Sequence, residues 1–243
     1  MIKKNFDIPF KVICDFDGTI SKNDTFDQLL ERYADPVWQD IEAEWLKGKI
    51  GTGECMSRQM ALINIEKQEL DNWLSHIKID KNFIKFVKFC KNVGIEVSIA
   101  SDGVDYIIKN ILKNYRLDFL KFESNKLVFK KEGKYELSFA KKSSLCESGS
   151  MVCKCSVAQK EKDNKKIIYV GDGFSDFCVS KHVDLVIAKS SLLAHCIKNN
   201  LPNYPFYDFS DVKNIITDLM RDKKVIVSRK LENEKIFFKN LNS

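Results

Sequence analysis

Three short apolar segments of this chain each end in a loop that combines aspartate with glycine. The segments are 10–14, 95–100 and 166–170, and the loops that follow them read DFDGT, SDG and GDGFSD. A short apolar run that is closed by a turn signal is typical of a strand buried on both faces. Because helix-like segments separate the three runs, the pattern predicts an α/β fold with a mostly parallel sheet and with all three loops at one edge.

The segment between the first two strands has almost no strand pattern. From residue 24 to about 75, apolar side chains recur at helical spacing, and Pro36 and a glycine-rich stretch divide the segment into several helices. We therefore expect a helical cap domain over 23–78 that is inserted into a core domain made of 1–22 and 79–243.

Periodicity also predicts the remaining elements of the core. Alternating apolar residues over 119–139, with a turn at 132–133, predict a β-hairpin. The other expected elements are helices over 83–90, 104–112, 154–162, 174–181 and 191–199, strands over 185–188 and 204–207, and a helix that begins at 211. The lysine-rich segment 222–243 is expected to be peripheral.

Charge and hydropathy narrow the classes of function. The 40 Lys and Arg residues exceed the 34 Asp and Glu residues, but the surplus of +6 is spread along the chain without a basic block. This distribution argues against a nucleic-acid-binding module. The sequence has no apolar run of the roughly 18 residues that a membrane span needs, and no signal-peptide pattern, so we expect a cytoplasmic protein that does not bind membranes.

Eight cysteines are scattered along the chain, and only Cys146, Cys153 and Cys155 lie close together in sequence. A zinc site usually shows paired C-x2-C units or nearby histidines, whereas the three histidines lie elsewhere in sequence. We therefore interpret this cluster as a loop with reduced thiols rather than as a metal site.

The three acidic loops predict a metal-dependent site. Carboxylates that share a cleft repel one another unless a cation lies among them, and a set of oxygen ligands favours Mg²⁺. A magnesium ion in turn attracts phosphate. Each loop alone could also be a solvated turn or a helix cap. That explanation requires such turns or caps to coincide at three successive strand ends, so we prefer the metal-dependent site.

The order of these motifs resembles the haloacid dehalogenase (HAD) superfamily of phosphatases, subfamily IB. The chain carries D-x-D-G-T at 15–19, a serine after the second strand at 101, a lysine, and then G-D-G-x-S-D at 171–176. The resemblance implies a Rossmannoid catalytic core with a C1-type helical cap after the first strand. It also implies a Mg²⁺-dependent phosphoric monoester hydrolase that works through an aspartyl-phosphate.

The resemblance assigns catalytic roles to three residues. Asp15 is the expected nucleophile, and Asp17 is the expected general acid and base. Two residues along an extended strand end return to the same face, so both carboxylates can reach one phosphoryl group. Lys154 is the expected catalytic lysine, since MVCKCS looks like a variant of the C-x-x-C-K segment of this branch; Lys141, Lys142 and Lys160 remain alternatives.

The resemblance also implies binding residues. Ser101, with the backbone N–H groups of Asp102 and Gly103 at the start of the next helix, is expected to bind the phosphate. The expected metal ligands or supporting groups are Asp15, Asp17 (through its carbonyl), Asp172 and Asp176.

Within the superfamily, the chain is similar to the phosphoserine-phosphatase-like branch. Stretches such as VGDGFSDFCVSKHVDLVIAKSSLLAHC look most like methionine-salvage phosphatases that act on 2-hydroxy-3-keto-5-methylthiopentenyl-1-phosphate. Phosphoserine is the alternative substrate. In that case Asp24 would bind an amino group and Arg58 a carboxylate, although Asp24 could equally be a helix N-cap and Arg58 a surface charge.

We therefore expect an enzyme that acts on a small phosphomonoester as a monomer or homodimer. A non-catalytic phospholigand-binding protein of the same fold is the alternative.

Overall fold

A seven-stranded sheet forms the centre of the protein. The computed structural model describes residues 10–131, 134–139, 150–162 and 165–221. The sheet order is β4-β3-β2-β1-β5-β6-β7, and the strands are β1 (Phe10–Cys14), β2 (Val97–Val104), β3 (Lys121–Phe129), β4 (Tyr135–Ser138), β5 (Lys166–Gly171), β6 (Leu185–Ala188) and β7 (Asn203–Pro205). All neighbouring strands are parallel except β3 and β4. The predicted α/β class and mostly parallel sheet are confirmed.

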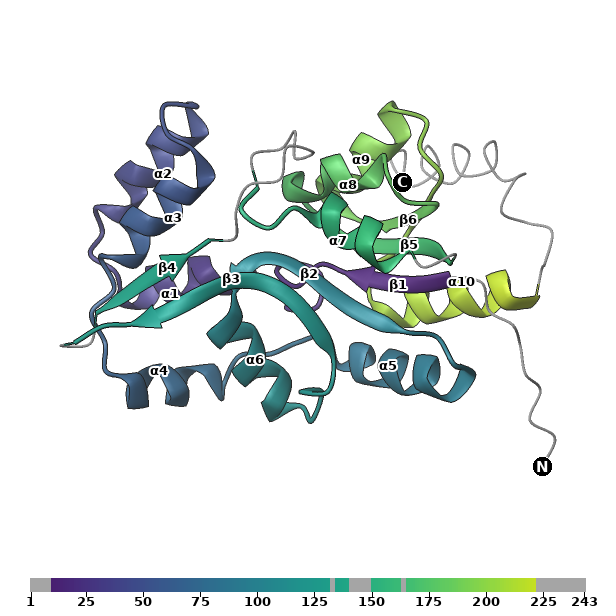
Figure 1. Ribbon diagram of the computed structural model, residues 1–243, viewed down its shortest axis with the longest axis horizontal. Helices are drawn as coiled ribbons and strands as arrows, with labels where there is room; N and C mark the ends of the chain where they lie inside the picture. The colour runs from purple at the N-terminus through teal and green to yellow at the C-terminus, as the bar shows by residue number, and fades with distance from the viewer. Residues whose placement is uncertain (1–9, 132–133, 140–149, 163–164, 222–243) are drawn as a thin grey trace, which may run out of the picture.

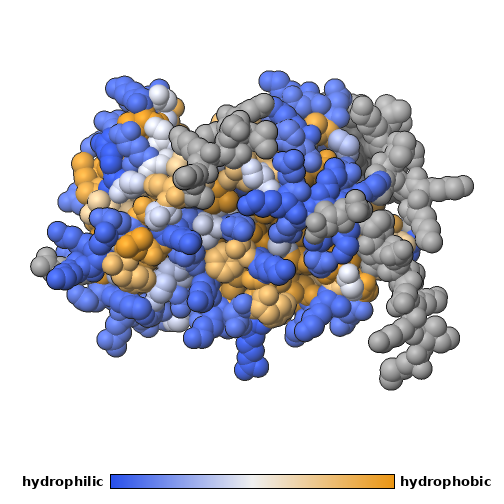
Figure 2. All heavy atoms as spheres, viewed as in Figure 1, coloured by the Kyte–Doolittle hydropathy of each residue, from blue (hydrophilic) through white to orange (hydrophobic). Residues whose placement is uncertain are grey.

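Helices cover both faces of the sheet (Figure 1). One face carries α5 (Lys81–Val93), α6 (Asp105–Asn114) and α10 (Phe209–Arg221), and the other carries α7 (Lys154–Glu161), the short 3-10 turn η1 (Phe174–Asp176), α8 (Phe177–Ser180) and α9 (Ser190–Lys198). Polar side chains cover most of the outer surface on the side seen in Figure 2, with smaller apolar patches between them.

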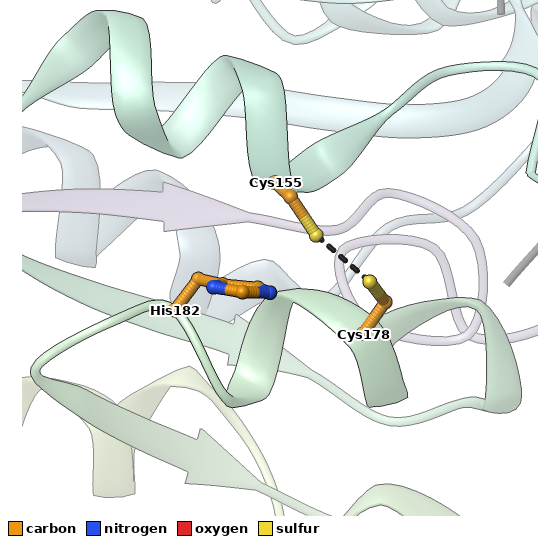
Figure 3. A group of neighbouring side chains, drawn as sticks. All are labelled: Cys155, Cys178 and His182. Carbon is orange, nitrogen blue, oxygen red and sulfur yellow. Dashed lines mark hydrogen bonds between the residues drawn. The ribbon is translucent and has the colours of Figure 1, made fainter. Parts of the chain in front are cut away.

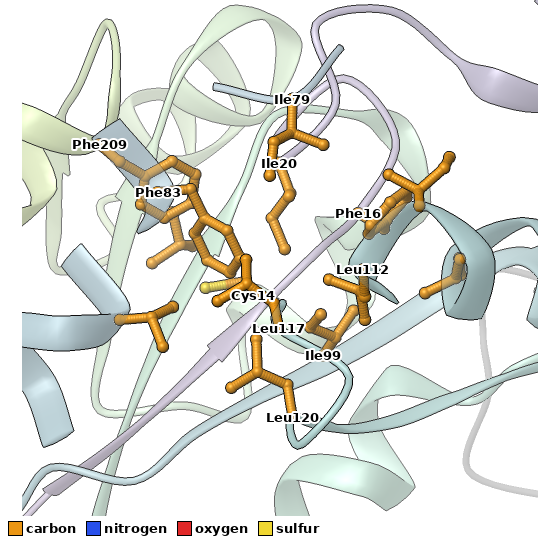
Figure 4. Close-up of a cluster of buried hydrophobic side chains, with 14 of the residues drawn as sticks. Cys14, Phe16, Ile20, Ile79, Phe83, Ile99, Leu112, Leu117, Leu120 and Phe209 are labelled. Atoms are coloured by element: carbon orange, nitrogen blue, oxygen red, sulfur yellow. The ribbon is translucent and has the colours of Figure 1, made fainter. Parts of the chain in front are cut away.

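The central strand β1 joins the two apolar layers because successive side chains point to opposite faces. Val12 and Cys14 belong to the larger buried cluster, whereas Ile13 belongs to the cluster on the α7 face. Figure 4 shows part of the larger cluster, in which Phe83 of α5 and Phe209 of α10 lie beside the strand; their ring centroids are 4.7 Å apart. All five residues of β1 are buried, so the strand end that carries the first acidic loop is held rigidly.

Four helices are inserted between β1 and β2. They are α1 (Thr25–Tyr33), α2 (Trp38–Leu46), α3 (Thr52–Met60) and α4 (Lys67–Leu74). A two-residue antiparallel bridge between Ser21 and Ile79 joins the beginning and the end of this insertion. Several of its buried residues, among them Leu30 and Leu74, belong to the larger cluster of the core. The helical character of this segment is confirmed; its boundaries as a separate domain stay a prediction.

The structure confirms the hairpin β3–β4 and extends it, since β3 also pairs in parallel with β2. It corrects the expected end of the second strand. β2 continues through 101–103 to Val104, with a bulge between Ala100 and Val104, so SDG is part of a strand rather than a turn. Strand β7 and helix α10 also begin earlier than expected, and the lysine-rich segment 222–243 lies outside the described residues.

Within the described part of the chain, no helix is long and apolar enough to cross a membrane.

Candidate active site

The three acidic loops and the inserted helices enclose a pocket of about 460 Å³. Its floor comes from the ends of β1, β2 and β5, and its walls come from α1, α2 and α3. The lining residues that face the strand ends are Asp15, Asp17, Gly18, Ser101, Asp102, Gly103, Ser150, Asp172, Gly173, Phe174 and Ser175. Those from the inserted helices and their approach are Asp24, Phe26, Asp27, Glu42, Trp45, Thr52, Cys55, Met56 and Gln59. The sheet edge therefore gathers the predicted acidic loops in one cleft.

A buried lysine joins two of these loops. The Nζ atom of Lys154 lies 2.9 Å from Asp15 Oδ2 and 2.6 Å from Asp176 Oδ1, and it donates to Ser175 Oγ at 2.9 Å. Burial lowers the pKa of Lys154, but the charges of Asp15 and Asp176 outweigh burial and raise that pKa above its usual value. Burial and the nearby Asp176 raise the pKa of Asp15 despite the lysine. The ammonium group thus stays charged and holds both carboxylates in place.

Lys154 lies at the first position of α7, which places its ammonium group beneath the pocket floor, against Asp15 and Asp176. Of the alternatives, Lys160 is exposed on the same helix, and Lys141 and Lys142 lie outside the described residues. Among the candidate lysines that the structure describes, Lys154 is the one that contacts the acidic loops.

Asp176 is fully buried and accepts four hydrogen bonds. Besides Lys154, the hydroxyl of Tyr169 donates to Oδ1 at 2.6 Å, and the N–H groups of Asp172 and Gly173 donate to Oδ2 at 3.1 and 3.2 Å. By accepting these hydrogen bonds, the Asp176 carboxylate holds the backbone of the third acidic loop in position. Our sequence reasoning missed Tyr169, and the signal for it is a phenol in an otherwise apolar strand, which needs a partner when it is buried.

Asp17 lies at the base of the first inserted helix. Its Oδ1 accepts from the backbone N–H and the hydroxyl of Thr25, at 2.8 and 2.7 Å, and Ser101 Oγ lies 3.4 Å from Oδ2. Burial, followed by repulsion from Asp24, raises the pKa of Asp17 to about 7. A carboxyl group with this pKa can both give and take a proton near neutral pH. Thr25 is a second residue that the sequence reasoning missed.

Asp172 is positioned by the first loop. The hydroxyl of Thr19 donates to Asp172 Oδ1 at 2.6 Å. Gly18 has a φ angle of +69°, and a Cβ atom there would lie 2.5 Å from Asp172 Oδ2. Glycine at this position therefore serves both the left-handed turn and the close approach of the carboxylate.

The carboxylates of Asp15, Asp172 and Asp176 offer a set of oxygen atoms that all lie within 4.8 Å of one another. Such an oxygen-only set fits a hard divalent cation such as Mg²⁺, so the residues present match the predicted cofactor in donor chemistry. The side chain of Asp17 is not part of this group. The structure brings the three aspartates together from both the first and the third acidic loops.

Hydrogen bonds join residues within the second loop and connect this loop to the segment before Lys154. Ser101 is buried, and its Oγ accepts from the N–H of Gly103 at 2.9 Å. Asp102 Oδ1 accepts from the N–H of Val152 at 2.7 Å. Because α6 begins only at residue 105, the N–H groups of Asp102 and Gly103 lie before the helix and not in its first turn, contrary to expectation.

The outer wall of the pocket is acidic and apolar. Asp24 caps α1 by accepting from the N–H groups of Phe26 and Asp27, at 2.8 and 3.0 Å, and it also lines the pocket. The Asp24 side chain is exposed, but the protein around it removes part of its hydration, and this desolvation raises its pKa. Burial and the charges of Asp24 and Glu42 raise the pKa of Asp27 to about 7. The N-cap role and the pocket position of Asp24 were alternatives in the sequence, and the same side chain has both.

The structure does not bring Arg58 to this pocket. Its guanidinium pairs with Glu44 at 2.6 Å and with Glu54 at 3.6 Å on an exposed side of α3, whereas Cys55, Met56 and Gln59 of the same helix line the pocket. No lysine or arginine is among the described residues that line it.

Comparison with known proteins gives consistent matches over most of the chain. A family model described as Putative Phosphatase matches residues 10–195. A 2-hydroxy-3-keto-5-methylthiopentenyl-1-phosphate phosphatase of Geobacillus thermodenitrificans (strain NG80-2) is 28% identical over 205 residues, which cover 83% of this chain and 92% of that protein. A phosphatase of the same name from Bacillus velezensis (strain DSM 23117 / BGSC 10A6 / LMG 26770 / FZB42) is 29% identical, covering 86% of this chain and 90% of that protein.

Solved structures show the same fold at lower identity. A substrate-bound phosphoserine phosphatase complex has a TM-score of 0.63 and 20% identity, and covers 86% of this chain and 98% of that chain. Phosphoserine phosphatase from T. onnurineus has a TM-score of 0.63 and 15% identity, with 89% and 98% covered. The architecture described above is therefore that of the HAD-fold phosphatases.

Proposed function

Since this chain belongs to the family described as Putative Phosphatase and is a phosphatase of the HAD superfamily, we propose that it hydrolyses a small phosphomonoester with the help of Mg²⁺. The observation that carries the proposal is the buried Lys154, whose ammonium group pairs with Asp15 and Asp176 at the pocket floor. A non-catalytic binding protein has no need to hold a nucleophilic carboxylate against a buried cation beside a second carboxyl group with a pKa of about 7.

The proposed reaction has two steps. A carboxylate oxygen of Asp15 attacks phosphorus, the bond from phosphorus to the leaving oxygen breaks, and the carboxylic acid of Asp17 protonates that oxygen. Asp17, now a carboxylate, then takes a proton from water. The resulting hydroxide attacks the aspartyl-phosphate, the bond between phosphorus and the Asp15 oxygen breaks, and inorganic phosphate leaves.

Neighbouring residues stabilise the phosphoryl group in this scheme. Lys154 supplies a positive charge next to Asp15, and the Ser101 hydroxyl, which lies 3.4 Å from Asp17 Oδ2, supplies a hydrogen bond to a phosphoryl oxygen. Asp15 and Asp172, supported by Asp176, would hold the Mg²⁺ ion, which when bound supplies further positive charge for the phosphate. Thr25 keeps the carboxyl group of Asp17 turned toward the pocket.

The pocket wall favours a leaving group without a carboxylate. Phe26, Trp45 and Met56 give an apolar surface that suits a methylthio group, while Asp24 and Glu42 can accept hydrogen bonds from hydroxyl groups. The described lining has no lysine or arginine to pair with the carboxylate of phosphoserine. These features, with the names of the relatives, support a 2-hydroxy-3-keto-5-methylthiopentenyl-1-phosphate phosphatase over a phosphoserine phosphatase.

Several properties of the whole protein form part of this proposal. Residues 23–78 act as a cap domain over a catalytic core made of 1–22 and 79–243. The protein works in the cytoplasm as a monomer or homodimer, without nucleic acid.

A substrate panel with a matched variant tests the proposal. The purified chain is assayed for phosphate release from the methylthio enol phosphate, from phosphoserine and from p-nitrophenyl phosphate, in Mg²⁺ and in EDTA. We expect the highest kcat/KM for the methylthio substrate, loss of activity in EDTA that Mg²⁺ restores, and no turnover by Asp15→Asn. Wild-type turnover of p-nitrophenyl phosphate by Asp15→Asn would contradict the mechanism, and a higher kcat/KM for phosphoserine would contradict the substrate.

A further inference from the structure

A second group of potential metal ligands lies close in sequence to active-site residues but is not part of the described pocket lining. It consists of Cys155 in α7, Cys178 in α8 and His182 just after α8 (Figure 3). The Sγ atoms of the two cysteines are 3.0 Å apart. The two sulfur atoms and one imidazole nitrogen of His182 all lie within 4.8 Å of one another. None of these side chains lines the pocket as described.

Local structure explains why these three residues meet. Cys178 and His182 are four residues apart, a spacing that places side chains on the same side of a helical turn. Cys155 comes from the neighbouring helix α7, which packs against α8. Both cysteines are buried in the cluster on the α7 face, whereas His182 is exposed. The group therefore has a buried sulfur side and an open imidazole side.

The chemistry of this group differs from that of the aspartates. Two thiolates and an imidazole are soft or borderline ligands that select Zn²⁺ and similar metals, while the carboxylates of the acidic loops suit Mg²⁺. We propose that Cys155, Cys178 and His182 form a binding site for a thiophilic metal ion of the Zn²⁺ class, with a water molecule as fourth ligand on the exposed side.

The two sulfur atoms lie close to the separation that one zinc ion needs. Two sulfur atoms on one tetrahedral zinc ion lie roughly 3.8 Å apart, because each Zn–S bond is about 2.3 Å long. On binding, the sulfur atoms would have to separate by about 0.8 Å from their present distance of 3.0 Å. The exposed His182 provides the route by which the ion enters.

Metal binding here would connect two elements of the active site. Cys155 follows Lys154 directly, and Cys178 lies two residues after Asp176. An ion that bridges α7 and α8 holds the helix that carries the lysine against the helix that follows its carboxylate partner. The site is thus structural or regulatory in effect, and it does not depend on the identity of the substrate.

Cobalt spectroscopy tests the proposal with the full chain. The reduced protein is saturated with Mg²⁺ so that the aspartates are occupied, and Co²⁺ is then added stepwise without oxygen. Co²⁺ bound to thiolates gives a near-ultraviolet charge-transfer band, which oxygen ligands do not give. We expect this band, at one Co²⁺ per chain, in the wild type, and we expect Zn²⁺ to remove it by displacing the cobalt.

Matched variants separate the site from other cysteines. Cys155→Ser and Cys178→Ser are expected to lose the band, and Cys90→Ser, which changes a buried cysteine in α5, is expected to keep it. Because His182 is exposed, His182→Asn keeps the fold and is expected to need a higher Co²⁺ concentration for the same band, whereas His76→Asn, an exposed control, is not.

Two results would overturn the proposal. They are the absence of the band in the wild type and a band that persists in both Cys155→Ser and Cys178→Ser. Circular dichroism of each variant shows whether it is folded, and an unfolded serine variant leaves His182→Asn as the deciding comparison.

Discussion

Replacing Lys154 with methionine removes the ammonium group that lies between Asp15 and Asp176. Methionine has a similar length and fills most of the same space, so the change removes charge with little change in packing. The lysine is 3% exposed, and its Nζ atom lies 2.9 Å from one carboxylate and 2.6 Å from the other. The substitution therefore leaves two buried carboxylates without their cation.

The structure gives the size of the effect. At an effective dielectric constant of about 20, each of these contacts is worth roughly 6 kcal/mol before desolvation is counted. Desolvation offsets most of that energy, and removing one partner of a buried pair costs about 3–5 kcal/mol of stability. We expect a loss of this size in Mg²⁺-free protein at pH 8, and a smaller loss at pH 5, because Asp15 has a raised pKa and there takes up a proton more readily.

The assay combines unfolding with turnover. Urea unfolding in EDTA gives the free energy difference, and hydrolysis of p-nitrophenyl phosphate in Mg²⁺ is expected to fall about 10²–10³-fold, since a charge that stabilises the transition state is gone. Lys160→Met is the matched control, because Lys160 is exposed on the same helix, and its stability is expected to stay within about 0.5 kcal/mol of wild type. The reasoning is wrong if Lys154→Met unfolds within about 1 kcal/mol of wild type and keeps its turnover, or if Lys160→Met shows the larger loss.

Three further predictions concern protons, glycine and the core. In the folded protein the pKa of Asp17 is about 7, above its value in the unfolded chain, so its contribution to stability is present below about pH 4 and is lost as pH rises through 7. Free energies of unfolding from urea titrations of Mg²⁺-free protein should therefore decline over this pH range, and Asp17→Asn should remove up to about 4 kcal/mol of the decline. Gly18→Ala places a Cβ atom against Asp172 and should raise the Mg²⁺ concentration for half-maximal activity by about tenfold or more, since roughly 1–3 kcal/mol of strain falls on the site. Gly48→Ala has the same φ of +69° with open space around it, and it should leave that concentration unchanged. Phe83→Ala, at a fully buried ring, should lower the free energy of unfolding by about 3–5 kcal/mol in urea titration, and a loss below about 1 kcal/mol would contradict the packing argument.

The part of the site that could be predicted from the sequence is the part that strand ends determine. A parallel sheet brings the carboxyl ends of its strands to one edge, so apolar runs that end at Asp15, Ser101 and Asp172 were enough to predict a common cleft. The local reading failed at 101–103, because SDG looks like a turn but the backbone continues as a bulged strand.

The supporting residues could not be predicted in the same way. Tyr169 and Thr25 act through hydrogen bonds to aspartates that other segments position, and the sequence does not show which side chain a hydroxyl will meet. Cys155 meets Cys178 only because two helices pack together, so a search for cysteines close in sequence could not find this pair. Arg58 was a candidate carboxylate ligand for phosphoserine, with a surface charge as the alternative, and glutamates on α2 and α3 hold it on the outside.

The balance of charge in the site limits the order in which ligands can bind. Asp15, Asp17, Asp172 and Asp176 together carry four negative charges when ionised, and Lys154 supplies one positive charge, which leaves a net charge of −3. Burial raises the pKa of Asp15, Asp17 and Asp172, so the metal-free site retains protons rather than this full charge. A bound divalent cation would reduce the net charge to −1 and favour the ionised carboxylates, so we expect its binding to release protons and to strengthen as pH rises. The ionised, metal-free site would repel a phosphate dianion, so we expect productive binding of a phosphorylated substrate to follow or accompany binding of the cation.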